Sequence, residues 1–231
     1  MKDYILGNYS LLGAAEVIGF GDDGFYIKEI DRDTANRIII KNHYSKKIYS
    51  GSYIHLGVFM DGELVGILQY GYAMNPQSMD GVVAGTKIDE YLELNRMWLH
   101  DKAPRNSESK AISYSIKYIK RKYKKIKWIQ SFADERCGRF GVVYQAANFQ
   151  YYGEHKSDFW ELDGVVYHNI IMTVKEGASQ YNATTKRLQE NRDRATKYSL
   201  RQFRYLYFIN EREKKNCRLK QKPYPKHGAI V

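Results

Sequence analysis

Length, composition and charge exclude several classes of protein. The chain has 231 residues, 43% hydrophobic and 14% aromatic, so we expect one folded core rather than a disordered chain. Its net charge is +11 and its only cysteines are Cys137 and Cys217, whose spacing predicts neither a disulfide framework nor a metal site. No apolar run resembles a signal peptide or a membrane span, so we expect a cytoplasmic protein without a membrane partner.

The first ninety residues predict a strand, a helix and a hairpin. Residues 1–24 support no clear prediction, and residues 71–90 are expected to form a loop. Asp31 is a good N-cap for a helix that carries Ile38, Ile39 and Ile40. Asp61 and Gly62 form the favoured two-residue turn of a hairpin. The strands are expected at residues 25–30, 55–60 and 63–70.

The stretch from 91 to 153 organises the chain. It predicts a strand, a loop, a basic helix, a second strand and a short helix, at residues 91–99, 103–109, 109–123, 126–133 and 141–149. A strand, helix and strand in succession imply parallel pairing with a right-handed crossover. Because ligands bind beyond the C-terminal ends of such strands, one crevice is expected to gather Arg105, Asn106, Ser109, Asp134 and Tyr144.

The remaining chain predicts a second hairpin about Asp163 and Gly164, then a more basic region. Its elements are expected at residues 158–162, 165–174, 185–197 (helix) and 203–209 (strand), with a short basic helix after Asn210. The fold class is therefore α/β (α+β), with a mixed central sheet flanked by helices. We expect a catalytic domain at 1–175 and a basic extension at 176–231 packed on it.

Positive charge is concentrated in two segments. Residues 184–226 hold fourteen Lys/Arg and four Asp/Glu, a net +10, and residues 117–127 hold seven Lys/Arg and no acid. Such a concentration favours a polyanion partner, although a solvated tail is the alternative. Interleaved tyrosines favour nucleic acid.

Several short motifs together resemble one family. They are His43-Tyr44-Ser45, Glu93-Leu94-Asn95-Arg96, Arg105 to Ser109, Ser131 to Asp134, Gly141 to Phe149, Tyr152-Gly153, Phe203 to Phe208 and Pro223 to Lys226. In this order over residues 43–226 they resemble the Mom family of phage DNA-modification proteins, within the GNAT acyltransferase superfamily. The resemblance implies a GNAT-like fold. It also implies modification of the exocyclic amine of adenine in DNA by a carbamoylmethyl-type group, in a phage-infected bacterial cytoplasm, as protection from restriction.

The resemblance implies acyl-CoA, most simply acetyl-CoA, as the donor. Arg105, Asn106, Ser107 and Ser109 are the candidates for binding its pyrophosphate at the helix N-terminus. The loop lacks the glycines usual in this superfamily, and Glu108 is unfavourable beside phosphate. A glycyl donor such as glycyl-tRNA is therefore a rival, because a carbamoylmethyl group contains the atoms of one glycyl unit. The histidines show no metal-ligand spacing, so we predict no required metal.

Three residues are candidates for catalysis. Asp134 can accept the proton of the amine, or it can cap a loop. Tyr144 can protonate a leaving group or bind an oxyanion, or it can be a core tyrosine. Ser109 can bind donor phosphate, or it can cap the helix.

Further residues are candidates for binding DNA, whose target base must be flipped or single-stranded. His43 and Tyr44 can contact that base, or they can form an ordinary turn. Arg96 lies in an apolar strand and needs an anionic partner. Glu93, three residues away, is expected on the opposite face of the strand. The anionic partner of Arg96 can then be a ligand, or Arg96 can instead reach the edge of the sheet. The residues expected to hold the DNA backbone are Lys120, Lys124 and Arg204.

Two other functions remain open. One is a non-catalytic nucleic-acid-binding protein on a GNAT-like fold, which has no reason to keep both Asp134 and Tyr144. The other is an ordinary CoA-dependent N-acetyltransferase, which has no need of the basic C-terminal region.

Overall fold

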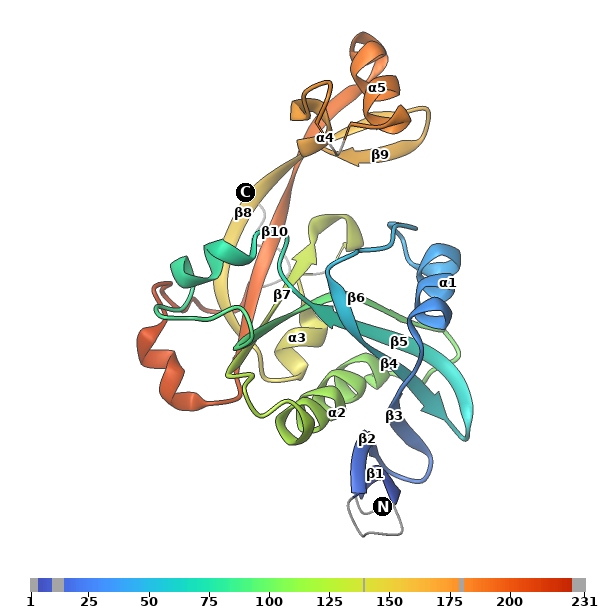
Figure 1. Cartoon of the computed structure of the whole chain (residues 1–231), viewed down its shortest axis with the longest axis vertical. Helices are drawn as coiled ribbons and strands as arrows, with labels where there is room; N and C mark the ends of the chain where they lie inside the picture. The colour runs from blue at the N-terminus through green and yellow to red at the C-terminus, as the bar shows by residue number, and fades with distance from the viewer. Residues whose placement is uncertain (1–3, 10–14, 139, 179–180, 226–231) are drawn as a thin grey trace.

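A computed structural model describes residues 4–9, 15–138, 140–178 and 181–225 (Figure 1). Its described strands form one mixed sheet in the order β1-β2-β3-β4-β5-β6-β7-β10-β8-β9. They are β1 (Tyr4–Tyr9), β2 (Ala15–Gly21), β3 (Phe25–Glu29), β4 (Ser52–Met60), β5 (Glu63–Gly71), β6 (Tyr91–Leu99), β7 (Trp128–Asp134), β8 (Gln150–Leu162), β9 (Val165–His168) and β10 (Thr196–Phe208). The α-helices are α1 (Arg32–Asn42), α2 (Ser107–Lys122), α3 (Val142–Ala146), α4 (Ile170–Thr173) and α5 (Ala183–Glu190). The predicted mixed sheet flanked by helices is confirmed.

Helices cover both faces of the sheet. Leu68 packs in the main core with residues of α2, whereas the preceding Ile67 packs with Ala35 and Ile39 of α1. Because neighbouring residues of a strand point to opposite faces, α1 and α2 lie on opposite sides. We call these two sides of the sheet the α1 face and the α2 face.

The two central strands pair briefly and then separate. β6 and β7 are parallel, as predicted, but they pair only from Tyr91 to Glu93 and from Trp128 to Gln130. Beyond that point β6 remains paired with β5, and β7 pairs with β10. The separation opens a slot through the sheet, with Glu93 and Gln130 at its closed end.

A small lobe projects from the body on the outer halves of β8 and β10, together with β9, α4 and α5 (Figure 1). Trp160, Leu162, Tyr167 and Leu188 form its own core. The hairpin turn at Asp163 and Gly164 is confirmed by their left-handed φ values of 52° and 75°.

Several boundaries differ from the predictions in this part of the chain. The strand expected at 165–174 ends at His168, and α4 follows. The helix expected at 185–197 ends at Glu190, and β10 begins at Thr196 rather than at 203. Pairing along most of β8 extends β10, so tertiary contacts override the polar composition of its first half.

Other parts of the chain also differ from what the sequence predicted. β1 and β2 form a hairpin within 1–24, and a 3-10 helix, Pro76–Gly81, interrupts the loop expected at 71–90. Residues 176–231, expected as an extension, supply β10 between β7 and β8. The basic helix expected after Asn210 is a 3-10 helix, Glu211–Asn216, and Lys226 lies outside the described residues.

Local signals at one helix N-terminus and one other hairpin turn are confirmed. Asp31 caps α1, because its Oδ1 accepts a hydrogen bond from the Thr34 N–H at 2.8 Å. Asp61 and Gly62 have φ values of 49° and 82°, as a type I′ hairpin turn requires. Asn148, after α3, has a φ of 63°, the left-handed stop that its side chain favours.

Candidate active site

Three adjoining cavities connect the start of α2 with the α1 face of the sheet. The donor-side cavity, about 280 Å³, lies at the N-terminus of α2 and shares Leu99, Glu108, Val142 and Val143 with the next. The slot cavity, about 290 Å³, lies between β6 and β7. The groove cavity, about 390 Å³, lies on the α1 face and shares its upper wall with the slot, including Leu94, Phe132 and Asp134.

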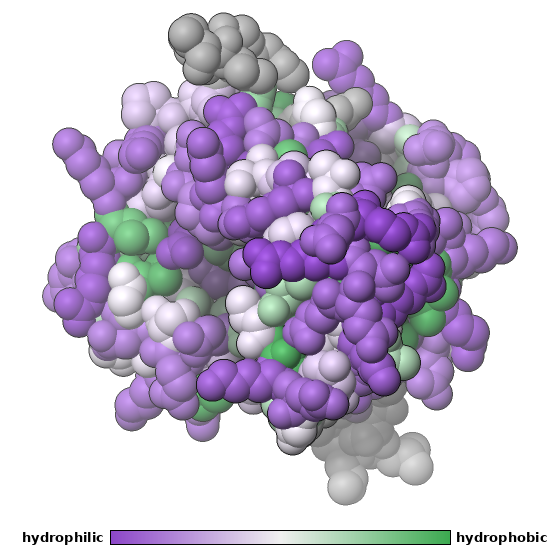
Figure 2. Space-filling view, turned by 90° about the horizontal axis from the view of Figure 1, so that it is seen from above, coloured by the Kyte–Doolittle hydropathy of each residue, from purple (hydrophilic) through white to green (hydrophobic). Residues whose placement is uncertain are grey.

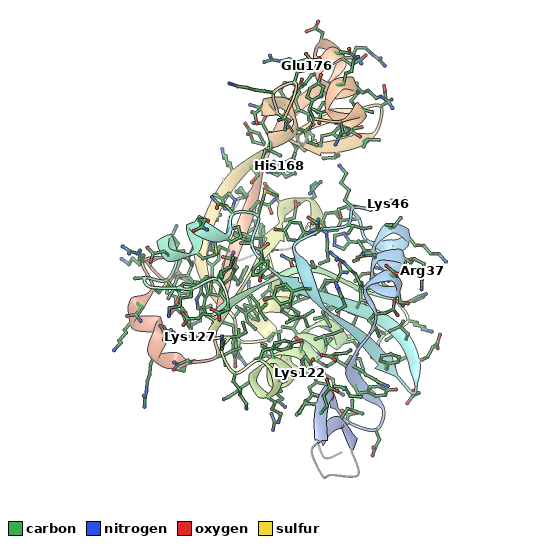
Figure 3. All side chains as sticks on the ribbon, in the orientation of Figure 1. Arg37, Lys46, Lys122, Lys127, His168 and Glu176 are labelled. Atoms are coloured by element: carbon green, nitrogen blue, oxygen red, sulfur yellow. The ribbon has the colours of Figure 1, made fainter. Side chains whose placement is uncertain are left out.

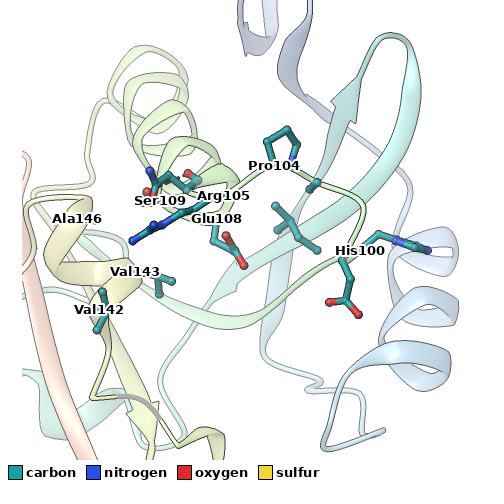
Figure 4. A pocket seen from close by; sticks show the side chains of 12 residues that line it. His100, Pro104, Arg105, Glu108, Ser109, Val142, Val143 and Ala146 are labelled. Carbon is teal, nitrogen blue, oxygen red and sulfur yellow. Dashed lines mark hydrogen bonds between the residues drawn. The ribbon is translucent and has the colours of Figure 1, made fainter. Parts of the chain in front are cut away.

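The donor-side cavity has an open helix terminus. Arg105 extends from the loop before α2 toward Val142 and Val143 of α3 (Figure 4). Asn106 precedes the helix with a φ of 71°, and its side chain makes no capping hydrogen bond. The amides of that turn have no partner within the helix, and they favour an anion.

The predicted donor-binding residues do not all line this cavity. Arg105, Asn106 and Ser109 do. The Ser109 hydroxyl donates to the Asn106 carbonyl at 3.0 Å. This contact is not a cap, because a capping oxygen accepts from a backbone N–H, so both interpretations of this serine stay predictions. Ser107 is buried and is not among the lining residues.

Tyr144 and Asp134 line the slot from opposite faces of the sheet. Tyr144 is buried against Phe149 and Tyr205, with ring centres 5.8 and 5.5 Å away. Burial raises its pKa to about 12, so the hydroxyl stays protonated at neutral pH and can donate.

Asp134 is already bound to a neighbour. Its Oδ1 accepts from the Arg136 backbone N–H at 2.9 Å, and its Oδ2 accepts from the guanidinium of the same arginine. Asp134 therefore caps the short turn after β7, as its alternative interpretation stated, while it also lines the slot and the groove.

A second carboxylate, Glu93, lines the groove at the closed end of the slot. Its Oε2 accepts from Gln130 Nε2 at 2.7 Å and its Oε1 from Asn95 Nδ2 at 3.2 Å. Burial raises the pKa of Glu93 to about 7, although these hydrogen bonds and the charges of Arg96 and Arg204 oppose the shift. Its charge also contributes to the raised pKa of Tyr144 after burial, whereas Asp134 is not among the causes.

Gln130 carries an unsatisfied acceptor beside that carboxylate. Its side chain is 1% exposed and lines the groove, and its Oε1 has no hydrogen-bond partner in the part of the chain that the structure describes. A buried acceptor without a partner costs about 1–3 kcal/mol. Gln202 Nε2, a donor at the other end of the groove, is also buried and has no hydrogen-bond partner among the described residues.

Arg96 and Glu93 lie on the same face, contrary to the prediction. Gln69 pairs with Arg96 and Tyr70 with Leu94, so Asn95 is the extra residue of a β-bulge. A bulge shifts the alternation by one residue. Arg96 therefore lines the groove with Glu93, and it donates to the carbonyls of Asn95 at 2.7 Å and Lys47 at 3.3 Å.

Comparison with known proteins places the chain in a family. The model of the Mom protein family matches residues 24–226. The methylcarbamoylase mom of Escherichia phage Mu is 48% identical over 214 residues, which cover 91% of this chain and 88% of the relative. The chain belongs to the Mom family. A methylcarbamoylase is a transferase, and this chain is accordingly an enzyme of the transferase type.

Solved structures with similar folds were also found. An acetyltransferase of the GNAT family from Streptococcus pneumoniae has a TM-score of 0.45 and 12% identity over 80% of this chain and 99% of the other. NAA60 of Arabidopsis thaliana, in complex with acetyl-CoA, has a TM-score of 0.49 and 10% identity over 80% and 99%.

In this Mom family member, the predicted base-binding pair lies between the slot and the groove. His43 is buried, and its Nδ1 lies 2.8 Å from the Ser45 hydroxyl. Burial, with the charges of Arg96 and Arg136, lowers its pKa to about 4, so the ring is neutral. Tyr44 is 55% exposed at the groove.

Arginines and aromatic rings wall the groove, and sequence reasoning missed most of them. The guanidinium of Arg136 lies 5.2 Å from the ring centre of Tyr44 and 4.6 Å from that of Phe159. Arg204, which was predicted, lies 5.1 Å from the ring centre of Phe132. The period of two in Gln130, Phe132 and Asp134 was a usable signal, since all three line the groove.

The two predicted DNA-binding lysines lie elsewhere. Lys120 and Lys124 line a cavity at the C-terminal end of α2, and the 16 residues of that helix separate this end from the donor-side cavity by about 24 Å. Lys122 and Lys127 mark this end in Figure 3, far from His168 and Lys46 beside the groove. The DNA contacts of Lys120 and Lys124 remain predictions, and this distance from the groove leads us to expect that they contribute less to DNA affinity than the groove does.

Among the residues that the structure describes, no three His, Cys, Asp or Glu side chains gather as a metal site, and the absence of a required metal stays a prediction. None of the described helices has the length and apolar character needed to cross a membrane. From the end that carries the lobe, the surface is mostly hydrophilic (Figure 2).

Proposed function

We propose that this enzyme transfers an acyl-type group to the exocyclic amine of adenine in phage DNA, in the cytoplasm of the host, and so protects the DNA from restriction. The observation that carries this proposal is the connected path of three cavities. An anion-binding helix terminus lies at one end, and a groove walled by arginines and aromatic rings lies at the other. A donor and a base can therefore meet at the slot.

Acyl-CoA is the donor that the donor-side cavity supports best. Arg105 supplies positive charge for a pyrophosphate, and the N-terminus of α2 supplies backbone N–H groups, except that of Ser107, which donates to the Pro104 carbonyl at 3.1 Å. Glu108 also lines this cavity and weakens its affinity for anions. A glycyl donor, such as glycyl-tRNA, remains the rival.

The slot offers a proton donor and two carboxylates. Tyr144 is protonated at neutral pH, so it can protonate the leaving group of the donor. The amine loses a proton as it attacks, and either Asp134 or Glu93 accepts it. The new N–C bond forms as the bond between the acyl group and its leaving group breaks. The carboxylate gains the proton that the amine loses, and Tyr144 loses the proton that the leaving group gains.

The groove supports entry of a flipped base rather than of a whole duplex. A base inside a duplex must leave the stack before its amine can react. Tyr44 and Met74, 55% and 64% exposed, flank the groove from two different loops. An apolar side chain of this kind can fill the gap that a flipped base leaves, and we assign this wedge to Met74.

Mass spectrometry of nucleosides tests the function. DNA from cells that express the chain should contain a modified adenine, and cells that express Tyr144→Phe should lack it. Tyr207→Phe is a matched control, because Tyr207 also packs against the core but does not line the slot. Unmodified DNA with the wild-type chain would contradict the proposal. Acetylation of proteins or small amines instead would support an ordinary acetyltransferase.

Isotopic labelling tests the donor. Purified protein is incubated with DNA and either labelled acetyl-CoA or labelled glycyl-tRNA. We expect label to enter adenine from acetyl-CoA without any tRNA. Label from glycyl-tRNA alone would replace acyl-CoA as the donor but leave the proposed substrate intact.

A further inference from the structure

The closed end of the slot has two hydrogen-bond acceptors that nothing in the described protein uses fully. Gln130 Oε1 is buried without a partner, although the Nε2 of the same amide donates to Glu93. When ionised, above its pKa of about 7, the Glu93 carboxylate accepts two hydrogen bonds and has lone pairs for more. Glu93 and Gln130 are register partners on β6 and β7, so their side chains stand next to each other in the groove.

This arrangement complements a primary amine attached to a planar ring. The exocyclic amine of adenine has two N–H groups, and each needs an acceptor once the base has left the duplex. We propose that Gln130 and Glu93 bind this amine, with one acceptor for each of its hydrogens. The inference rests on the proposed function and deepens it, because it assigns the residues that select adenine.

The same arrangement rejects guanine and thymine, although not cytosine, which also presents an amine. Guanine and thymine present a carbonyl oxygen at the equivalent position, and that oxygen would face two acceptors. The orientation of the Gln130 amide is fixed, because its Nε2 is held by Glu93 at 2.7 Å. The amide therefore cannot turn to donate to a carbonyl without leaving the carboxylate.

The position of Asp134 supports this assignment. Asp134 lies four residues farther along β7, and its oxygens bind Arg136. Glu93, by contrast, is held by the amide N–H groups of Gln130 and Asn95 and lines the groove beside Gln130.

The test compares bases that differ only at the amine. Oligonucleotide duplexes carry a site found modified in cellular DNA, with the target opposite an abasic position so that flipping costs little. The target is adenine, purine without the amine, or hypoxanthine with an oxygen in its place. Affinity is measured by fluorescence anisotropy without donor, for the wild type, Gln130→Met and Glu93→Gln, with Glu63→Gln as the control on the exposed end of β5.

The wild type and Glu63→Gln should bind adenine about tenfold more tightly than purine, and hypoxanthine more weakly than purine. Gln130→Met should bind adenine and purine within about twofold of each other, while its affinity for purine is unchanged. Glu93→Gln should gain affinity for hypoxanthine relative to adenine, because an amide can donate to the oxygen. Misfolding would not produce this inversion.

Two results would overturn the inference. One is a wild type that binds adenine and purine equally although cellular DNA carries modified adenine, which would leave the proposed function intact. The other is a wild-type pattern of base preference in both variants. If Gln130→Met does not bind purine, the base preference of the isosteric Glu93→Gln variant alone decides the test. DNA without modified adenine in cells would instead remove the proposed function itself.

Discussion

The groove and the C-terminal end of α2 both carry positive charge, but they hold it differently. In the groove, the guanidinium groups of Arg136 and Arg204 lie against aromatic rings. At the end of α2 the charge is carried by lysines, several of which pair with acids, as Lys125 does with Asp89 at 2.8 Å. Exposed pairs of this kind contribute little and are screened by salt. The density of charge in a sequence therefore does not locate a binding site, whereas its position beside a cavity does.

The largest expected effect comes from substitutions in the slot, and not from substitutions in either charged region. Tyr144→Phe should lower the rate of adenine modification at least about 100-fold, because it removes the proton donor but keeps the buried ring. Asp134→Ala should also abolish modification, since Asp134 holds Arg136 at the groove. Nucleoside mass spectrometry measures both, and circular dichroism checks that the variants fold. Full modification by either folded variant would remove that residue from the mechanism.

The next effect compares the two charged regions directly. Lys46→Ala with Arg204→Gln, at the groove, and Lys120→Ala with Lys124→Ala, at the end of α2, each remove two charges. The groove pair should weaken DNA binding about tenfold and lower the salt slope by about 1.8, or 0.9 per phosphate contact. The α2 pair should change affinity less than about twofold. Equal losses would mean that bound DNA bends around to reach α2.

A smaller effect should follow from the proposed wedge. Met74→Ala should slow modification of paired duplex about tenfold, because the gap left by the flipped base is no longer filled. The same variant should act at the wild-type rate when the target lies opposite an abasic position. Met60→Ala is a control for the loss of a methionine that packs against the core and lines none of the three cavities. Equal slowing on both substrates would show that Met74 acts in some other way.

Some parts of the site could be predicted from the sequence, and others could not. The strand and helix periodicities from 91 to 149 predicted one crevice, whereas the structure divides its residues, with Arg105 in the donor-side cavity and Asp134 and Tyr144 in the slot. The face of Glu93 was mispredicted, because the bulge at Asn95 has no local signature. The early start of β10 depends on pairing with β8, so Gln202 could not be placed in the groove. Such features depend on contacts between distant segments, which a single sequence does not reveal.

The smallest effect is a pH dependence that isolates Glu93. The folded chain holds the pKa of Glu93 at about 7, above its ordinary value of 4.5, mainly through burial. Between these two values the folded state keeps a proton that the unfolded chain has lost. Stability from this group is therefore fully present below pH 4.5 and is lost as the pH rises through 7. Glu93→Gln cannot titrate, and it should remove this contribution.

Thermal unfolding of the two proteins across this range measures the difference. The Tm of the wild type relative to Glu93→Gln should fall by a few degrees between pH 4.5 and 7.5. His43, which is held neutral with a pKa of about 4, produces the opposite slope, because the unfolded chain binds its proton first as the pH falls. That slope is common to both proteins and cancels in the comparison. A difference in Tm that stays constant with pH would show that Glu93 is ionised in the folded state, as an exposed carboxylate would be.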